Sequence, residues 1–376
     1  MFEDLTVLEI GQVLAGPYAG AILADLGATV IKIEKPQGGD DGRRMGAPFL
    51  NDDSLTFTEF NRGKRSVTLD LKSPEGLEQL HDLADRADAL IHNLRPDVPR
   101  AIGIEPERFC ARHPRLIYCE ISSFGSAGPM QFEPSFEALV QAYSGIVSSN
   151  GDPAGPPSRL PISAVDLGTS MWTVIGLLSA LREREKTGRG TIVRTSLFET
   201  ALGWMSQRIN AFLNQGVDEP RQSRSAHPGL VPYQSFAAAD GDLFVAVGND
   251  RHFAKFAHVL ERDDWVTNPA FVTNRLRLSN RAALVAEIDA VVAARPRAFW
   301  LERLSAVGVP CAPVNDVREL VTLEQFTAVD MLSPELGAST ARLVSLPITF
   351  DGKRPHPRGV APRLGENDTA PFPATS

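Results

Sequence analysis

The chain has 376 residues, and its 38 basic and 46 acidic side chains give a formal net charge of −8. An acidic chain of this kind lacks the lysine and arginine excess that nucleic acid or an anionic membrane surface requires, so we expect neither as a partner. Its 43% of hydrophobic and 22% of charged residues are typical of a globular protein, and the length predicts about two domains.

The expected cellular compartment follows from three further features. The cysteines are few and widely spaced, without a CxxC pair, which indicates a reducing environment. The amino terminus lacks the basic and apolar regions of a signal peptide. The apolar stretch from Ile162 to Leu181 contains Asp166, which favours a buried segment over a membrane span. We therefore expect a cytoplasmic protein.

The first 34 residues predict a strand, a turn, a helix and a second strand. These are TVLEI, GQVLAGP, an Ala/Leu-rich helix from about Tyr18 to Leu26, and ATVIKIE. Two apolar strands joined through one helix imply parallel pairing, which is the opening of a doubly wound sheet. Gly11, Gly16 and Gly20 do not have the GxGxxG spacing. An NAD site is therefore disfavoured, although Glu34 ends the second strand where an acid can hold a ribose hydroxyl.

Strands and helices continue to alternate further along. Strands are predicted in SVTLDLK, DALIHN, RLIYCEISSFG and TIVRTSL, and helices after Pro74, from Asp166 to about Arg182, and through Met205 to Asn214. The Gly/Pro-rich segment 125–161 is too long for a simple connection. From about Ser225 a smaller domain with strands around DGDLFVAVG and helices from His252 to Leu304 is expected. The fold class is therefore α/β.

Familiar catalytic motifs are missing from the sequence. There is no GxSxG elbow for a serine nucleophile. The seven histidines have no HxH or HExxH spacing, so no metal site is expected.

Asp166 stands out as a carboxylate inside the apolar passage ISAVDLGTSMW. Burial of an unpaired charge costs free energy, so the residue needs a role. One interpretation is a helix N-cap, because Asp is favoured ahead of an apolar helix. The other is a desolvated carboxylate that acts as a nucleophile or base. The two roles are compatible.

Seven segments that span nearly the whole chain carry a family resemblance. They are GQVLAGPYAGAILADLGATVIKIEKPQGGD, FNRGKRSVTLDLKSPEG, LIHNLRPD, the Asp166 passage, HPGLVPYQSF, DGDLFVAVGND and GVPCAPVNDV. Together they resemble family III CoA-transferases, a group related to the α-methylacyl-CoA racemases. The resemblance implies a Rossmann-like large domain over 1–215, completed by about 330–376, and a small α+β domain over 225–325. It also implies an interlocked, ring-like homodimer.

The resemblance gives Asp166 the role of the family's nucleophilic aspartate. In that role it attacks the donor acyl-CoA to form a mixed anhydride, and the released CoA thiolate then forms an aspartyl-CoA thioester. An acceptor carboxylate takes the CoA from this thioester. CoA is thus a substrate, and no permanently bound cofactor or metal is implied.

Three residues match the family's nucleotide contacts. Lys35 and Lys72 fall where the family places cations for the CoA phosphates, and Leu69 falls where it packs the adenine. On the alternative interpretation, each lysine is an ordinary strand-end or helix-start residue.

The segment LIHNLRPD matches the family motif beside the pantetheine chain through Asn93 and Leu94. The sequence departs from the family at the arginine that follows. Ala101 occupies that position, between Arg100 and Ile102, and all three residues are candidates for the CoA site.

The β-strand-to-helix turn supplies further candidates by resemblance. Ala15 and Gly16 match the turn that lines the CoA thiol region. Leu14 replaces a glutamine that oxalate-type members place near the reacting carboxyl, which argues against oxalate as the acceptor. Glu137 matches a family glutamate near the active site, and the alternative is an exposed acid on a helix face.

The racemase branch is the main rival. It needs two bases for deprotonation and reprotonation on opposite faces of the substrate. Phe136 occupies the position of its histidine base, so racemisation is the weaker hypothesis unless His227 supplies that base. His227 is equally consistent with a loop residue that precedes Pro228.

We therefore predict a CoA-transferase that uses an acyl-CoA donor such as succinyl-CoA and a carboxylic acid acceptor. A short dicarboxylate is favoured, because arginines that suit a second carboxylate lie on segments that can face the acyl pocket. These are Arg43, Arg44, Arg62 and Arg159. The alternatives are an acyl-CoA racemase or epimerase with Asp166 as a base, and a non-catalytic CoA-binding protein.

Overall fold

The computed structural model describes residues 1–50, 52–336 and 341–373. The chain forms two compact units. The large unit comprises Met1–Ile146, Leu160–Ile209 and Ala328–Ser376, and the small unit comprises Val147–Arg159 and Asn210–Thr327. Both ends of the chain belong to the large unit, whereas 147–159 and 210–215 pack with the small one.

A six-stranded parallel sheet forms the large unit, with the strand order β5-β2-β1-β6-β7-β8. Counted along the chain this is 3-2-1-4-5-6, the order of a Rossmann fold, which confirms the predicted doubly wound α/β class. The order reverses between β1 and β6. The strands are β1 (Thr6–Ile10), β2 (Thr29–Glu34), β5 (Arg65–Thr68), β6 (Ala89–His92), β7 (Ile117–Ser122) and β8 (Ile192–Ser196).

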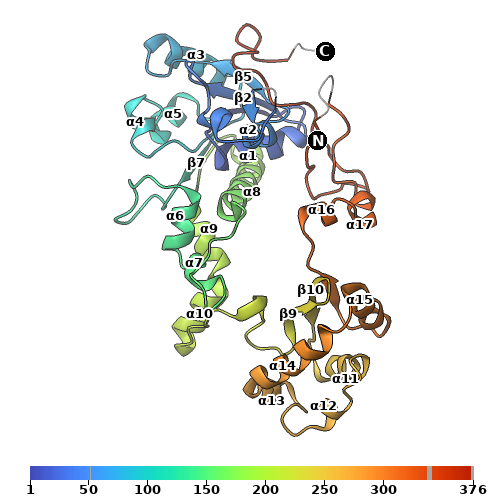
Figure 1. Ribbon diagram of the computed structural model, residues 1–376. Helices are drawn as coiled ribbons and strands as arrows, with labels where there is room; N and C mark the ends of the chain where they lie inside the picture. Colours follow the sequence, from blue (N-terminus) through green and yellow to red (C-terminus); the bar gives the residue numbers. More distant parts are fainter. Residues whose placement is uncertain (51, 337–340, 374–376) are drawn as a thin grey trace. The chain divides into compact units, whose positions relative to one another are not determined.

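Helices cover both faces of this sheet (Figure 1). Val7 and Val30 pack with α1, α8 and α9, whereas the next residues, Leu8 and Ile31, pack with α3 and α5 on the other face. This alternation follows from the two-residue period of a strand. The helices of the large unit are α1 (Ala15–Asp25), α2 (Leu55–Phe60), α3 (Pro74–Ala84), α4 (Val98–Ala101), α5 (Pro106–Arg112), α6 (Glu137–Tyr143), α8 (Ala164–Thr187) and α9 (Leu197–Trp204). The boundary to the small unit falls within α7 (Ile146–Ser149) and α10 (Ser206–Gln215). A short hairpin of β3 (Phe49–Leu50) and β4 (Asp53–Ser54) precedes α2.

Helix α1 begins earlier than the sequence predicted. It starts at Ala15, and the N–H of Tyr18 donates to the carbonyl of Leu14 at 2.7 Å. Pro17 is tolerated in this first turn because N–H groups there have no intrahelical acceptor. The last three of the seven residues of the predicted turn are therefore helical.

Helix α8 is the central helix of the large unit and runs five residues beyond the predicted end at Arg182. It stops at Thr187, where Gly188 takes a left-handed conformation with φ of 70°. Within the described residues, α8 alone is long and apolar enough by length and composition to cross a membrane. Half of its apolar window is buried, and the helix packs on α1, α9 and the sheet.

The small unit has an antiparallel three-stranded sheet in the order β11-β10-β9. Its core is aromatic, with Trp265, Phe236, Phe253 and Phe256 fully buried. Its strands are β9 (Tyr233–Ala238), β10 (Gly241–Ala246) and β11 (Cys311–Pro313), and its helices are α11 (Asp250–Val259), α12 (Asp264–Thr267), α13 (Asn274–Ser279), α14 (Arg281–Val292), α15 (Arg297–Ala306) and α16 (Val317–Leu320), with α17 (Glu324–Ala328) at its boundary.

Candidate active site

The turn between β1 and α1 lies where the strand order reverses. The side-chain amide of Asn93, directly after β6, binds this turn twice. Its Oδ1 accepts from the N–H of Gln12 at 2.8 Å, and its Nδ2 donates to the Gln12 carbonyl at 2.8 Å. Doubly wound sheets bind ligands in the crevice at this point. Asn93 therefore fixes the backbone at the expected position of a ligand.

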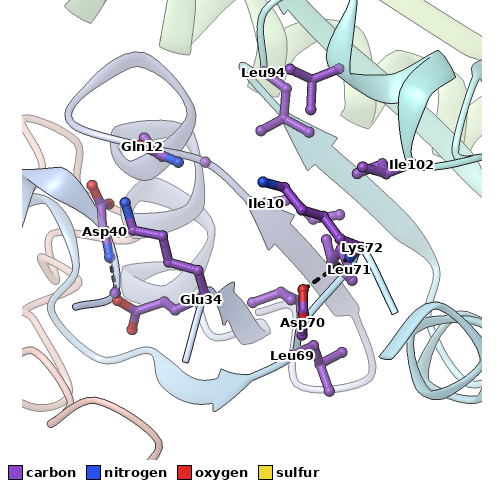
Figure 2. A pocket seen from close by; sticks show the side chains of 15 residues that line it. Ile10, Gln12, Glu34, Asp40, Leu69, Asp70, Leu71, Lys72, Leu94 and Ile102 are labelled. Carbon is purple, nitrogen blue, oxygen red and sulfur yellow. Dashed lines mark hydrogen bonds between the residues drawn. The ribbon is translucent and has the colours of Figure 1, made fainter. Parts of the chain in front are cut away.

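A pocket opens beside this turn, at the carboxyl ends of β1, β2 and β5 (Figure 2). Its cavity volume is about 150 Å³, below the ~300–1,000 Å³ of a site that encloses a whole drug-sized ligand. The pocket thus suits one part of a larger molecule. Five of the predicted CoA contacts line it: Lys35, Leu69, Lys72, Leu94 and Ile102.

The two predicted phosphate ligands differ in their surroundings. The Lys35 side chain is 47% exposed, and its Nζ pairs with Asp41 Oδ1 at 2.7 Å. Lys72 is exposed, and its side chain has no ion pair within the described part of the chain. Lys72 is therefore available to bind a phosphate directly, whereas Lys35 must break its ion pair with Asp41 before it can bind one.

The other predicted CoA residues lie outside the pocket lining. Leu14 and Ala15 are buried at the amino end of α1. Arg100 and Ala101 are exposed on α4, next to the pocket residue Ile102. The pocket therefore gathers the adenine and phosphate candidates, but not the candidates for the thiol end.

Glu34 is fully engaged by the protein itself. Its carboxylate accepts hydrogen bonds from Arg43, from the hydroxyl of Ser66 at 2.6 Å and from the N–H of Asp40 at 2.9 Å. Burial favours the neutral acid, but Arg43 and Lys32 outweigh it and lower the pKa of Glu34. The carboxylate is therefore not offered to a ribose hydroxyl.

Two of the arginines predicted to face an acyl pocket form buried ion pairs within the protein instead. Arg43 is buried and pairs with Glu34 and with Asp53 at 3.0 Å. Arg62 is buried and pairs with Asp25 at 2.7 Å. The expectation that these two present a guanidinium to a substrate carboxylate is wrong, because a buried arginine needs its own counter-ion.

The remaining polar candidates are distributed between the two units. Arg44 is exposed, and its Nη1 donates to the carbonyl of Gly38 at 2.6 Å. Arg159 is exposed in the small unit. His227 also belongs to the small unit, where its Nδ1 accepts from the N–H of Gly229 at 2.9 Å.

Asp166 is the third residue of α8 and is partly buried. Ser163 is the N-cap residue, so the N-cap interpretation of Asp166 is wrong. Its carboxylate makes no hydrogen bond or ion pair with any residue that the structure describes. Burial, with the charge of Glu137 as a second cause, raises the pKa of Asp166 to about 7. A poorly solvated carboxylate of this kind is a candidate nucleophile or base.

Glu137 is buried at the start of α6, so its interpretation as an exposed helix-face acid is wrong. Its Oε1 accepts from the side-chain amide of Gln141 at 2.7 Å and from the N–H of Val165 at 3.2 Å. That N–H belongs to the first turn of α8, where intrahelical acceptors are lacking. Glu137 therefore caps α8 from a neighbouring helix and adds negative charge close to Asp166.

Ser170 connects the helix of Asp166 to the β1–α1 turn. Its hydroxyl lies 2.7 Å from the carbonyl oxygen of Ala15 and 2.9 Å from that of Asp166. Residues four apart share one face of a helix, so Asp166 lies one turn of α8 away from the contact between Ser170 and the first residue of α1. Among the described contacts, the N–H groups of Ala15 and Gly16 have no acceptor. Such a helix end favours negative charge.

A buried group of charges lies beneath this turn and was missed by the sequence analysis. Lys32 Nζ pairs with Glu9 Oε1 and with Asp40 Oδ2, both at 2.8 Å, and Lys64 pairs with the other oxygen of Glu9. Burial lowers the pKa of Lys64 to about 8, although Glu9 favours its charged form. A signal was present, because Glu9 and Lys32 interrupt apolar strands and are register partners.

Comparison with known sequences assigns the chain to a protein family. CoA-transferase family III matches residues 2–368. The chain belongs to this family. It is 36% identical over 371 residues to acetyl-CoA:oxalate CoA-transferase of Acetobacter aceti, covering 98% of this chain and 94% of the relative. It is 31% identical over 339 residues to succinyl-CoA:glutarate CoA-transferase of Homo sapiens, covering 89% and 77% of the two chains.

Solved structures agree with this assignment. A CAIB/BAIF family protein from Brucella suis matches this family III CoA-transferase with a TM-score of 0.88 at 33% identity, over 97% of each chain. Rv3272 from Mycobacterium tuberculosis matches with a TM-score of 0.87 at 28% identity, over 98% of each chain. The predicted family, fold class and enzyme class, an acyl-CoA:carboxylate CoA-transferase, are therefore confirmed.

Proposed function

We propose that this enzyme moves CoA from an acyl-CoA, with succinyl-CoA as the first candidate donor, to a short dicarboxylic acid. Relatives named succinyl-CoA:glutarate and succinyl-CoA:mesaconate CoA-transferase, at 32% and 33% identity, support this substrate class. Because another relative is named for oxalate, oxalate stays among the acceptors to be tested despite the leucine at Leu14.

The observation that carries the proposal is the partly buried carboxylate of Asp166, which has no partner among the described residues and lies beside the amino end of α1. A carboxylate without hydrogen-bond donors is a stronger nucleophile than a solvated one, and a pKa near 7 leaves a large ionised fraction at neutral pH. The unsatisfied N–H groups of Ala15 and Gly16 suit the negative charge that develops on an attacked carbonyl oxygen.

The transfer proceeds in four exchanges that balance without a proton donor. The carboxylate of Asp166 attacks the thioester carbonyl of the donor, the C–S bond breaks, and a mixed anhydride and CoA thiolate form. The thiolate attacks the aspartyl carbonyl and releases the donor acid, which leaves an aspartyl-CoA thioester. The acceptor carboxylate displaces the thiolate, and the thiolate then attacks the acceptor carbonyl and regenerates Asp166.

We infer the position of CoA from the two ends of the site. The pocket lined by Leu69 and Lys72 takes the adenine and phosphates, because it joins an apolar wall to an exposed cation. The pantetheine chain then runs past Leu94 and the β1–α1 turn towards Asp166. The small volume of the pocket, about 150 Å³, agrees with this arrangement if only the adenine is enclosed and the phosphates lie at the exposed edge beside Lys72.

We also propose that the enzyme is an interlocked homodimer. Large apolar side chains on α8 of the large unit are exposed, with Trp172 at 52%, Ile175 at 51% and Met171 at 48%. Leu139 and Tyr143, four residues apart on α6, are exposed as well. Exposed apolar groups of this size on helix faces mark interaction surfaces. A molar mass of about twice 40.8 kDa by light scattering tests this proposal.

A substrate panel tests the transferase against its rival. The protein is incubated with succinyl-CoA or acetyl-CoA and a mixture of oxalate, glutarate, mesaconate and monocarboxylic acids in deuterated buffer, and all CoA esters are read by mass. New dicarboxyl-CoA esters support the proposal and name the acceptor. A branched acyl-CoA that gains one deuterium without any new ester would instead show a racemase with Asp166 as a base.

A further inference from the structure

Side chains from several separate elements hold the backbone of the segment Gly11–Pro17, which comprises the β1–α1 turn and the first three residues of α1 and is called the Gly11–Pro17 turn below. Besides the contacts of Asn93 and Ser170, three charged residues of the buried group bind it. Lys32 Nζ donates to the Gly11 carbonyl at 2.9 Å, Asp40 Oδ1 accepts from the Val13 N–H at 3.0 Å, and Lys64 Nζ donates to the Pro17 carbonyl at 2.7 Å. Charged side chains thus form hydrogen bonds with the backbone at the first residue of the turn, within it and at its last residue.

This turn is also strained. Val13 has a φ of 65°, a left-handed conformation that a β-branched residue rarely adopts. Such strain persists only where the surroundings over-determine the backbone, and it concentrates at functional sites. Asp40 supplies part of that constraint, because the carboxylate that binds Val13 is itself paired with Lys32.

The glycines at positions 11 and 20 are explained by packing and not by phosphate binding. A Cβ on Gly20 would lie 2.5 Å from Glu9 Oε2 and 3.1 Å from Lys64 Nζ. A Cβ on Gly11 would lie 2.8 Å from Glu9 Oε1. Both glycines therefore leave room for the Glu9 carboxylate against the turn and helix α1. Their spacing, which does not fit a dinucleotide fingerprint, fits this packing.

We propose that Glu9, Lys32, Asp40 and Lys64 are positioning residues that fix the Gly11–Pro17 turn, and through it the amino end of α1, for the reaction at Asp166. The inference rests on the proposed function, since the amino end of α1 is where the attacked carbonyl is stabilised. The four groups carry two positive and two negative charges. They are buried beneath the turn, and their polar contacts run to one another, to the backbone beside them and, from Lys64 Nζ, to Asn61 Oδ1 at 2.9 Å.

Gly20→Ala is the most informative variant. Alanine is the better helix former, so an ordinary helix position predicts unchanged or increased stability. Here the added methyl displaces Glu9 and Lys64 and loosens their hold on the turn. Gly203→Ala on α9 is the matched control, because a Cβ on Gly203 meets no atom within 4 Å. Lys64→Met, alone and combined with Glu9→Gln, removes the charges without steric conflict.

Two readouts are measured on the full-length protein. Hydrogen exchange followed by mass spectrometry reports the amides of Gln12, Val13 and Leu14. Steady-state kinetics with succinyl-CoA and the best acceptor reports kcat and KM separately. We expect faster exchange of the turn in Gly20→Ala and Lys64→Met, and a kcat lowered about 10- to 100-fold with KM changed less than about threefold. Gly203→Ala should match the wild type in both readouts.

Folded Gly20→Ala and Lys64→Met proteins with wild-type exchange and wild-type kcat would overturn the inference. A raised KM with an unchanged kcat would assign the charges to CoA binding and would also reject the inference. Should Gly20→Ala not fold, the Glu9→Gln/Lys64→Met protein, which leaves no unpaired charge on either residue, decides the question. If the wild type transfers no CoA to any acid, the proposed function fails, while hydrogen exchange still reports whether the charges hold the turn.

Discussion

Replacement of Asp166 by asparagine should stabilise the protein while it abolishes activity. The carboxyl has a pKa of about 7 in the folded enzyme and 3.8 as its ordinary value. The folded state therefore binds the proton more tightly than the unfolded chain does between these two pH values. Stability contributed by this group is present at low pH and is lost as the pH rises towards 7.

The structure sets the size of this effect. A shift of about three pKa units corresponds to about 4 kcal/mol of unfolding free energy at pH 8.5, and to about 2 kcal/mol at pH 5. The uncharged side chain of the variant would remove the free-energy cost of a buried carboxylate. It would leave a polar amide without a partner, which costs about 1 kcal/mol. Asp166→Asn should therefore be more stable than the wild type by about 3 kcal/mol at pH 8.5 and by about 1 kcal/mol at pH 5.

Urea unfolding followed by circular dichroism at the two pH values measures these differences. Asp218→Asn is the control, because Asp218 is exposed and makes no hydrogen bond or ion pair with a described residue. The control should show no stabilisation at either pH. An Asp166→Asn protein that is no more stable than the wild type at pH 8.5, or whose advantage does not change with pH, would refute the reasoning.

Three further predictions follow from named contacts. Glu137→Gln keeps an acceptor for the Val165 N–H but removes the charge that raises the pKa of Asp166, so the acid limb of the kcat/KM profile should move to lower pH; an unmoved limb contradicts this. Lys72→Ala should raise KM for the acyl-CoA about tenfold with kcat nearly unchanged, because a charged hydrogen bond to phosphate is lost; an unchanged KM places the phosphates elsewhere. Trp172→Arg should prevent dimer assembly in light scattering, and a mass still at twice that of the chain would locate the interface elsewhere.

The sequence predicted the fold well where local patterns suffice. Two apolar strands separated by an Ala/Leu-rich helix indicate a doubly wound sheet, and the apolar helix α8 is recognisable from Asp166 onwards. The helix start at Ala15 was missed, because a glycine and a proline in the first turn look like a loop. The N–H groups of a first turn have no intrahelical acceptor, so a proline is tolerated there. The strand order came only from the structure, since it depends on long-range pairing.

The site was predictable only in part. Family resemblance pointed to Asp166 and to the pocket lined by Leu69 and Lys72. The pKa of Asp166 depends first on its burial and then on Glu137, which is distant in sequence and comes close to it only through the packing of α6 on α8. Arg43 and Arg62 were assigned wrongly for the same reason, because the residues that bury and pair with them are not apparent from the sequence.

The most direct test of the central claim is a search for the covalent intermediate on Asp166. The enzyme is incubated with succinyl-CoA without an acceptor, quenched and digested, and the peptide that contains Asp166 is examined by mass spectrometry. We predict a CoA thioester on Asp166 that disappears when the acceptor acid is added, with acceptor-CoA formed in its place. An unmodified Asp166 peptide in an enzyme that turns over normally would contradict the account.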